Sequence, residues 1–216
     1  MSTLNTSRLE TLRERIRSLP TTPPPAPWKA IANVAVGGLS CVGFDRDCDL
    51  LLVVSSQGRG VFDCLSGERV ARDRGDYEED YAHLEAQGIG PLQGRAIRIA
   101  GAAGGALPNS TADGWALHRL ELAWPGQELV LTEPGSHLFG DLYDAPAPLH
   151  KIHQDSTVRA CGFSATGLSL VIATSSGKSA SREGERMTRG LSASVGRSIP
   201  ASSVPALTMM NVAGSM

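Results

Sequence analysis

Three histidines and one aspartate in the second half of the chain have the side-chain chemistry of a metal site. His150, His153 and Asp155 are close together in the sequence, and His137 or His118 could join them through the fold. Imidazole and carboxylate groups are the usual ligands of catalytic zinc, which activates water for hydrolysis. In an extended strand, however, His150 and His153 point to opposite faces, because they are three residues apart. One hypothesis for function is a metal-assisted hydrolase that uses His137, His150, His153 and Asp155.

Three alternating aspartates form a second candidate cation site. Asp45, Asp47 and Asp49 have the spacing that opens an oxygen-ligand calcium loop. Leu50 follows where such a loop needs glycine, and no glutamate stands at the twelfth position. Aspartate side chains also cap tight turns by accepting hydrogen bonds from nearby backbone amides. We therefore expect the three aspartates to stabilise a turn.

A third candidate site is an acidic run. Its carboxylates are Asp76, Glu78, Glu79 and Asp80. Such a run is usually a solvated surface, but it could also bind a basic partner. A second alternative for function is therefore an immunity-type inhibitor that places this run in the basic site of a partner protein. The chain has no Gly-x-Ser-x-Gly elbow, so it shows no signature of covalent catalysis, and we expect no cofactor.

The elements that must position these residues are organised by an internal repeat. Residues 43–58 and 162–177 align without a gap, 119 positions apart. Each copy begins with Gly-Phe, passes through a polar turn, continues as an apolar run and ends with glycine. The apolar run Leu50–Val54 suits a strand that is buried on both faces. Such a recurrence is typical of an architecture built from similar units.

The first copy and its continuation to Val70 resemble a blade of the WD40-like β-propellers. Phe62-Asp63 stands where such blades usually carry Trp-Asp, and Ser66-Gly67-Glu68 stands at the hairpin that leads to the next blade. The second copy matches only over residues 162–177, and the Gly-His pair that often opens a blade is absent. The resemblance implies a non-catalytic protein-interaction module, since propeller-like folds more often present loops to partners than perform chemistry.

We therefore expect an all-β fold, a small propeller-like array of antiparallel hairpin units with a short N-terminal helix and a disordered C-terminal tail. The expected ranges are a helix over residues 1–20, a Pro-rich linker over 21–29, a β domain over 30–178 and the tail over 179–216. The tail is assigned because it lacks apolar periodicity.

The second copy breaks off before its outer strands, which would leave an unpaired apolar edge at residues 168–175. We expect residues 30–36 to pair with this edge and to close the array. Alternatively, a second protomer would cover it. The paired phenylalanines Phe44 and Phe163 are expected at equivalent buried positions.

The amino-acid composition limits the classes of partner that we expect. A net charge of −2 gives no electrostatic reason to expect nucleic acid or a membrane surface, and no apolar run of about 20 residues exists. The four cysteines form no C-x-x-C pair and the N-terminus has no apolar signal core. We therefore expect a cytoplasmic protein that binds another protein. A homodimer through an exposed sheet edge or the N-terminal helix is a further expectation.

Overall fold

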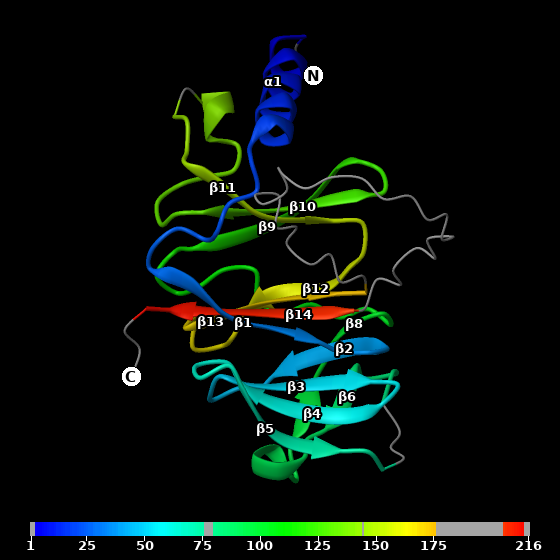
Figure 1. The fold of residues 1–216 in the computed structure, drawn as a ribbon. Helices are drawn as coiled ribbons and strands as arrows, with labels where there is room; N and C mark the ends of the chain where they lie inside the picture. Colours follow the sequence, from blue (N-terminus) through cyan, green and yellow to red (C-terminus); the bar gives the residue numbers. More distant parts are fainter. Residues whose placement is uncertain (1–2, 76–79, 144, 176–204, 214–216) are drawn as a thin grey trace, which may run out of the picture.

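The protein is built mostly from antiparallel β-sheets. The computed structural model describes residues 3–75, 80–143, 145–175 and 205–213, and within these ranges one α-helix is followed by fourteen strands in four sheets (Figure 1). Two short 3-10 helices, η1 (Gly90–Leu92) and η2 (Gly140–Tyr143), lie in connections between strands. The expected all-β architecture is therefore confirmed at the level of fold class.

The two copies of the repeat form the two central sheets. The first-copy sheet has the strand order β5-β4-β3-β2-β8, with β2 (Leu39–Phe44), β3 (Leu50–Ser55), β4 (Gly58–Asp63), β5 (Glu68–Asp73) and β8 (Ala100–Gly101). The second-copy sheet has the order β1-β14-β13-β12, with β1 (Trp28–Ala35), β12 (Val158–Phe163), β13 (Ser169–Thr174) and β14 (Ala206–Val212).

Two smaller sheets lie on either side of this pair. The three-stranded sheet has the order β11-β10-β9, with β9 (Ala116–Ala123), β10 (Gly126–Thr132) and β11 (Leu149–Asp155). The two-stranded sheet pairs β6 (Glu85–Gln87) with β7 (Ala96–Arg98).

The repeat seen in the sequence is also a repeat of strand register. The bounds of β2 and β3 become those of β12 and β13 when each is moved by 119 residues. Phe44 pairs with Leu51 in the first copy, as Phe163 pairs with Leu170 in the second, and both hairpins have a bulge at the same position. The sixteen-residue pattern therefore specifies one hairpin geometry twice.

Strand β14 completes the second copy from the far end of the chain. Asn211 pairs with Ser169 as Asp63 pairs with Leu50, so β14 occupies the position that β4 has in the first copy. The expectation of a disordered tail is thus wrong for residues 206–212. Their apolar side chains Leu207, Met209 and Met210 are buried, and this burial offsets the entropy of ordering the strand. The expected disorder of residues 179–204 falls outside the described residues.

The first strand lies in the expected sheet but has a different neighbour. Strand β1 pairs with β14, from Trp28 opposite Val212 to Ala35 opposite Ala206, instead of pairing directly with β13. The edge of β13 is therefore covered by the last strand of the same chain, and β1 lies outside that strand. The chain covers this edge by itself, without needing a second protomer.

The sheets pack face to face, because the strands of the repeat bury both faces. In β13, Leu170 and Ile172 face the three-stranded sheet, and Val171 and Ala173 face the first-copy sheet. The stack therefore runs from the three-stranded sheet through the second-copy and first-copy sheets to the two-stranded sheet (Figure 1). Phe44 and Phe163 occupy equivalent positions, each facing the next sheet along this stack.

The described sheets form an open stack and no closed propeller ring. Among the described residues, the three-stranded sheet packs only on the second-copy sheet and the helix, the two-stranded sheet packs only on the first-copy sheet, and the buried clusters do not join the two. The outer face of the three-stranded sheet packs on the helix instead of on another blade-like sheet. The expected propeller-like closure is therefore not present in this part of the chain.

Helix α1 (Thr3–Ser18) caps one end of the stack. Its buried residues Leu12 and Ile16 pack against Val130 of β10 and against Leu138 and Leu149. Arginines on the helix donate hydrogen bonds to backbone carbonyls of the body, including those of Ala147 and Leu122. The expected helix is thus docked on its own chain. No helix among the described residues is long and apolar enough to cross a membrane.

Candidate functional site

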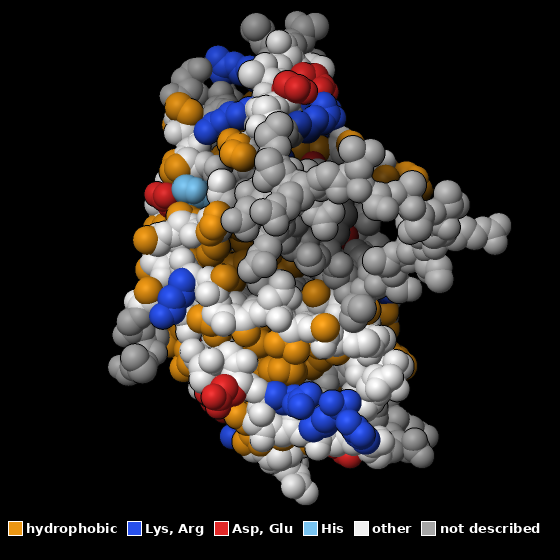
Figure 2. Space-filling model, in the orientation of Figure 1, with side chains coloured by type: hydrophobic (Ala, Val, Ile, Leu, Met, Phe, Trp, Pro, Cys, Tyr) orange, Lys and Arg blue, Asp and Glu red, His pale blue; other side chains and the backbone are white. Residues whose placement is uncertain are grey.

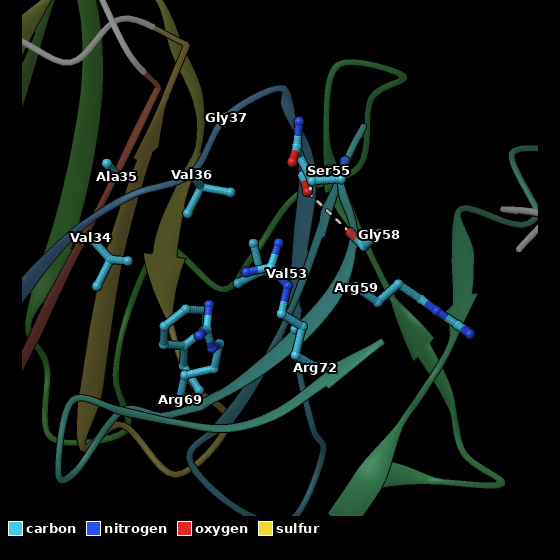
Figure 3. Close-up of a pocket in the computed structure, with 13 residues that line it drawn as sticks. Val34, Ala35, Val36, Gly37, Val53, Ser55, Gly58, Arg59, Arg69 and Arg72 are labelled. Atoms are coloured by element: carbon cyan, nitrogen blue, oxygen red, sulfur yellow. Dashed lines mark hydrogen bonds between the residues drawn. The ribbon is translucent and has the colours of Figure 1, made fainter. Parts of the chain in front are cut away.

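A groove opens where β1 ends beside the face of the first-copy sheet. Its volume is about 290 Å³, and we call it the arginine groove (Figure 3). Its apolar wall and floor and its charged rim are formed mainly by Val34, Val36, Val53, Phe62, Arg69 and Arg72. It lies between the end of β1 at Ala35 and the strands β4 and β5, which contribute Phe62, Arg69 and Arg72.

A β-bulge brings the two arginines of β5 to the same face. In a regular strand, residues three apart point to opposite sides. Here Arg69 pairs with Phe62 and Arg72 pairs with Gly60, while Val70 is an extra residue opposite the irregularity between Val61 and Phe62. Phe62 and Gly60 are two apart in β4, so the arginines opposite them share one face. The bulge therefore turns an Arg-x-x-Arg sequence into a pair of neighbouring guanidinium groups.

The arginines around the groove differ in their partners. The Arg59 Nη2 atom lies 2.6 Å from Asp73 Oδ2, and its Nη1 atom donates a hydrogen bond to the Gln87 carbonyl. The Gly75 amide and the Arg59 guanidinium together lower the pKa of Asp73. Arg69 and Arg72 are exposed, and no carboxylate of the described residues lies within ion-pair distance of either. Two positive charges are thus left without a described counter-charge.

The end of the groove is held by the β3–β4 turn. The Ser55 hydroxyl donates to the Gly58 carbonyl and accepts a hydrogen bond from the Gln57 amide. Gly58 has φ +100°, and a Cβ atom there would lie 2.2 Å from the Asp73 carbonyl oxygen. Only glycine fits such a close approach with a positive φ. The turn therefore holds β4 tightly against the end of β5.

The surface around the groove combines positive charge with exposed apolar atoms. Figure 2 shows Lys and Arg side chains gathered beside a hydrophobic band, over the first-copy sheet. Guanidinium groups bind carboxylate and phosphate through paired hydrogen bonds. Among the described residues, those that line the groove contribute no histidine and no carboxylate. The groove is therefore suited to binding an anion that is attached to an apolar group.

The histidines that suggested a metal site are distributed over separate places. His137 and His118 line a second cavity of about 940 Å³ beside α1, and His118 Nε2 lies 3.2 Å from Thr132 Oγ1. Burial lowers the pKa of His118. His150 Nε2 lies 2.9 Å from Glu133 Oε1.

The remaining predicted ligands lie on β11. His153 is opposite Leu129 in the sheet, and the Asp155 carboxylate accepts a hydrogen bond from the Thr157 amide at the turn into β12. The described residues contain no group of three His, Cys, Asp or Glu side chains that could hold a metal ion. The structure therefore does not bring the predicted ligands together.

Of the three alternating aspartates, Asp45 stabilises its own turn as expected, whereas Asp47 is exposed and its Oδ2 atom lies 3.6 Å from Arg95 Nη1. Asp45 is buried and accepts hydrogen bonds from the Asp47 amide at 2.9 Å and from Arg95 Nη1 at 2.6 and 2.7 Å. Burial alone would raise the pKa of Asp45, but these hydrogen bonds and one from the Cys48 thiol hold it below its usual value. The carboxylate is thus committed to an ion pair and a turn.

Asp49 joins the two copies of the repeat. Its carboxylate accepts hydrogen bonds from Ser164 Oγ at 2.7 Å and Thr166 Oγ1 at 2.8 Å. These hydroxyls belong to the turn of the second copy that corresponds to the aspartate turn of the first. One carboxylate therefore fastens the turns of two neighbouring sheets to each other.

The acidic run is only partly described. Asp76, Glu78 and Glu79 lie outside the described residues. Asp80 accepts hydrogen bonds from the His83 amide at 3.0 Å and from its Nδ1 at 2.8 Å, and this carboxylate raises the pKa of His83. No described contact tests a role for this run in binding a partner.

Sequence comparison adds no relative with a known role. No protein-family model matches the chain, and no curated protein is significantly similar to it.

Proposed function

We propose that this protein is a non-catalytic protein-interaction module, built from blade-like sheets of the WD40-like type, that holds its partner in the arginine groove. The observation that carries the proposal is the pair Arg69 and Arg72, placed on the same face of a sheet next to the half-buried side chains Val34 and Val36. Arginine and apolar groups are enriched where proteins bind each other.

Electrostatic repulsion between the two arginines in the free protein also supports the proposal. Like charges that are neighbours on one face of a sheet repel each other. Arg69 and Arg72 share the groove-facing side of β5, whereas the Arg59 side chain points to the opposite face of the sheet, where it contacts Asp73 and the Gln87 carbonyl (Figure 3). A local arrangement that disfavours folding without a visible compensating contact is typical of functional sites. A bound anionic group would remove this repulsion.

The apolar part of the groove supports binding of a protein segment. Val34, near the end of β1, and Val36, just after it, are only half-buried and line the groove. Covering apolar surface of this kind stabilises a complex by about 25 cal/mol per Å². Charge would then provide orientation and a fast encounter, and the apolar floor would add affinity.

The proposal is tested by reversing the charge of the pair. We expect the variant Arg69→Glu/Arg72→Glu to lose a partner that the wild-type protein retains in quantitative affinity purification from the source cells. The matched control Arg46→Glu/Arg159→Glu changes the same net charge at exposed positions outside the groove and should retain the partner. Both variants should unfold at the wild-type temperature. Equal retention by the two variants would refute the role of the groove.

A further inference from the structure

We infer that the arginine groove recognises the C-terminal residue of a partner chain, when that residue is apolar and carries a free α-carboxylate. This inference rests on the proposed function and specifies which part of the partner enters the groove. It follows from three features of the described residues: the size of the groove, the closeness of its charged and apolar parts, and the bulges in the neighbouring edge strands.

The groove is small. A volume of about 290 Å³ lies at the lower end of the range for ligand pockets, which is about 300–1,000 Å³. A space of this size holds little more than one large side chain. The partner must therefore present its recognised groups on one residue or on two adjacent ones.

The charged and apolar parts of the groove face the same space. Arg69 lies directly across from Phe62 on the face that also carries the groove, and Arg72 is its neighbour (Figure 3). In an extended segment, adjacent side chains point in opposite directions. An internal acidic residue next to an apolar one would therefore direct only one of them into the groove.

A terminal residue satisfies both parts at once. Its α-carboxylate and its side chain are attached to the same carbon atom, so they can enter one small space together. The two carboxylate oxygens have about four lone-pair sites and can accept hydrogen bonds from two guanidinium groups. The apolar side chain would then contact Val34, Val53 and Phe62.

The edge strands beside the groove are poorly suited to pairing with a partner strand. Strand β5 is the outer strand of its sheet, but Val70 bulges out of it and is 46% exposed. Strand β1, also an edge, has an irregularity between Ala30 and Ala32. Bulges and charged residues at a sheet edge prevent pairing with other chains. Recognition through side-chain insertion is therefore favoured over addition of a strand.

Two display libraries test the inference with the full-length protein. In the first, random heptapeptides end in a free carboxylate, and in the second the same heptapeptides are flanked by chain on both sides. We expect enrichment only from the first library, with an apolar residue at the last position. A selected peptide is then synthesised as the free acid and as the C-terminal amide. We expect amidation to weaken binding about tenfold or more.

Protein variants connect the peptide to the groove. The substitution Arg69→Gln/Arg72→Gln should weaken binding of the free acid to the level of the amide and leave the amide unchanged. The control Arg46→Gln/Arg159→Gln should leave both affinities unchanged. Enrichment from the flanked library, no enrichment from either library, or equal affinity of acid and amide would overturn the inference. If those failures occur while the charge-reversal variant still loses its protein partner, the proposed function stands and the C-terminal recognition does not.

Discussion

Removing β14 should unfold the protein, because this strand forms part of two buried layers. The perturbation is a chain that ends at residue 204. It would lack Leu207, Met209 and Met210, which are 0%, 0% and 3% exposed. Truncation of one such side chain to alanine costs about 2–5 kcal/mol. Loss of all three would cost about 6–15 kcal/mol, which equals the whole stability of a typical domain, about 5–15 kcal/mol.

The loss extends to β1, because β14 is its partner in the sheet. Urea denaturation followed by circular dichroism would measure the effect, together with size-exclusion chromatography. Single substitutions would show how much each position of β14 contributes to stability. Leu207→Ala should lower the free energy of unfolding by about 2–5 kcal/mol, whereas Thr208→Ala, at a half-buried position, should change it by no more than about 1 kcal/mol. A truncated chain that is monomeric and has the wild-type midpoint would refute the role assigned to β14.

Three further predictions concern the repeat and its turns. Phe163→Ala should cost about 3–5 kcal/mol and Phe44→Ala somewhat less, because Phe163 is fully enclosed beside Trp28; equal wild-type stability in denaturant would contradict this. Asp49→Ala should cost about 1–3 kcal/mol, because the buried Ser164 hydroxyl and the more exposed Thr166 hydroxyl lose their acceptor, and a neutral result in the same assay would show that the link between copies is not stabilising. Arg95→Gln should destabilise at neutral pH. Because the folded pKa of Asp45 is lowered, its contribution is full above about pH 4 and is lost as the pH falls further, so a loss independent of pH down to pH 2 would disprove the ion-pair explanation.

The hairpins of the repeat could be predicted from the sequence, since an apolar run between fixed turns leaves little freedom of register. Strand β14 could not, because its residues are separated from the second copy by a long insertion. Met209-Met210-Asn211 occupies the place of Val61-Phe62-Asp63. Methionine in place of valine and phenylalanine keeps the apolar character but hides the similarity. Only its pairing with β13 shows that β14 occupies the position of β4.

The arginine groove could not be predicted from the sequence, for a different reason. The regular alternation of a strand places Arg69 and Arg72 on opposite faces, and a single bulge at Val70 changes this. No local signal marks a bulge of this kind. The predicted metal ligands differ from the arginines in the opposite sense. They are close in the sequence, but the fold gives them separate partners, as it gives Glu133 to His150.

The second-copy sheet joins β1 to β14, strands that are far apart in the sequence, and this has a consequence for synthesis on the ribosome. The first-copy strands β2–β5 lie within residues 39–73 and can pair early, whereas β13 must wait for β14. At about 5–20 residues per second, the chain between Thr174 and Ala206 takes about 2–6 s to make. During that time the nascent strand exposes apolar residues on both faces. A product that stops short of residue 206 keeps them exposed, so chaperones and proteases can distinguish it from a chain that contains β14.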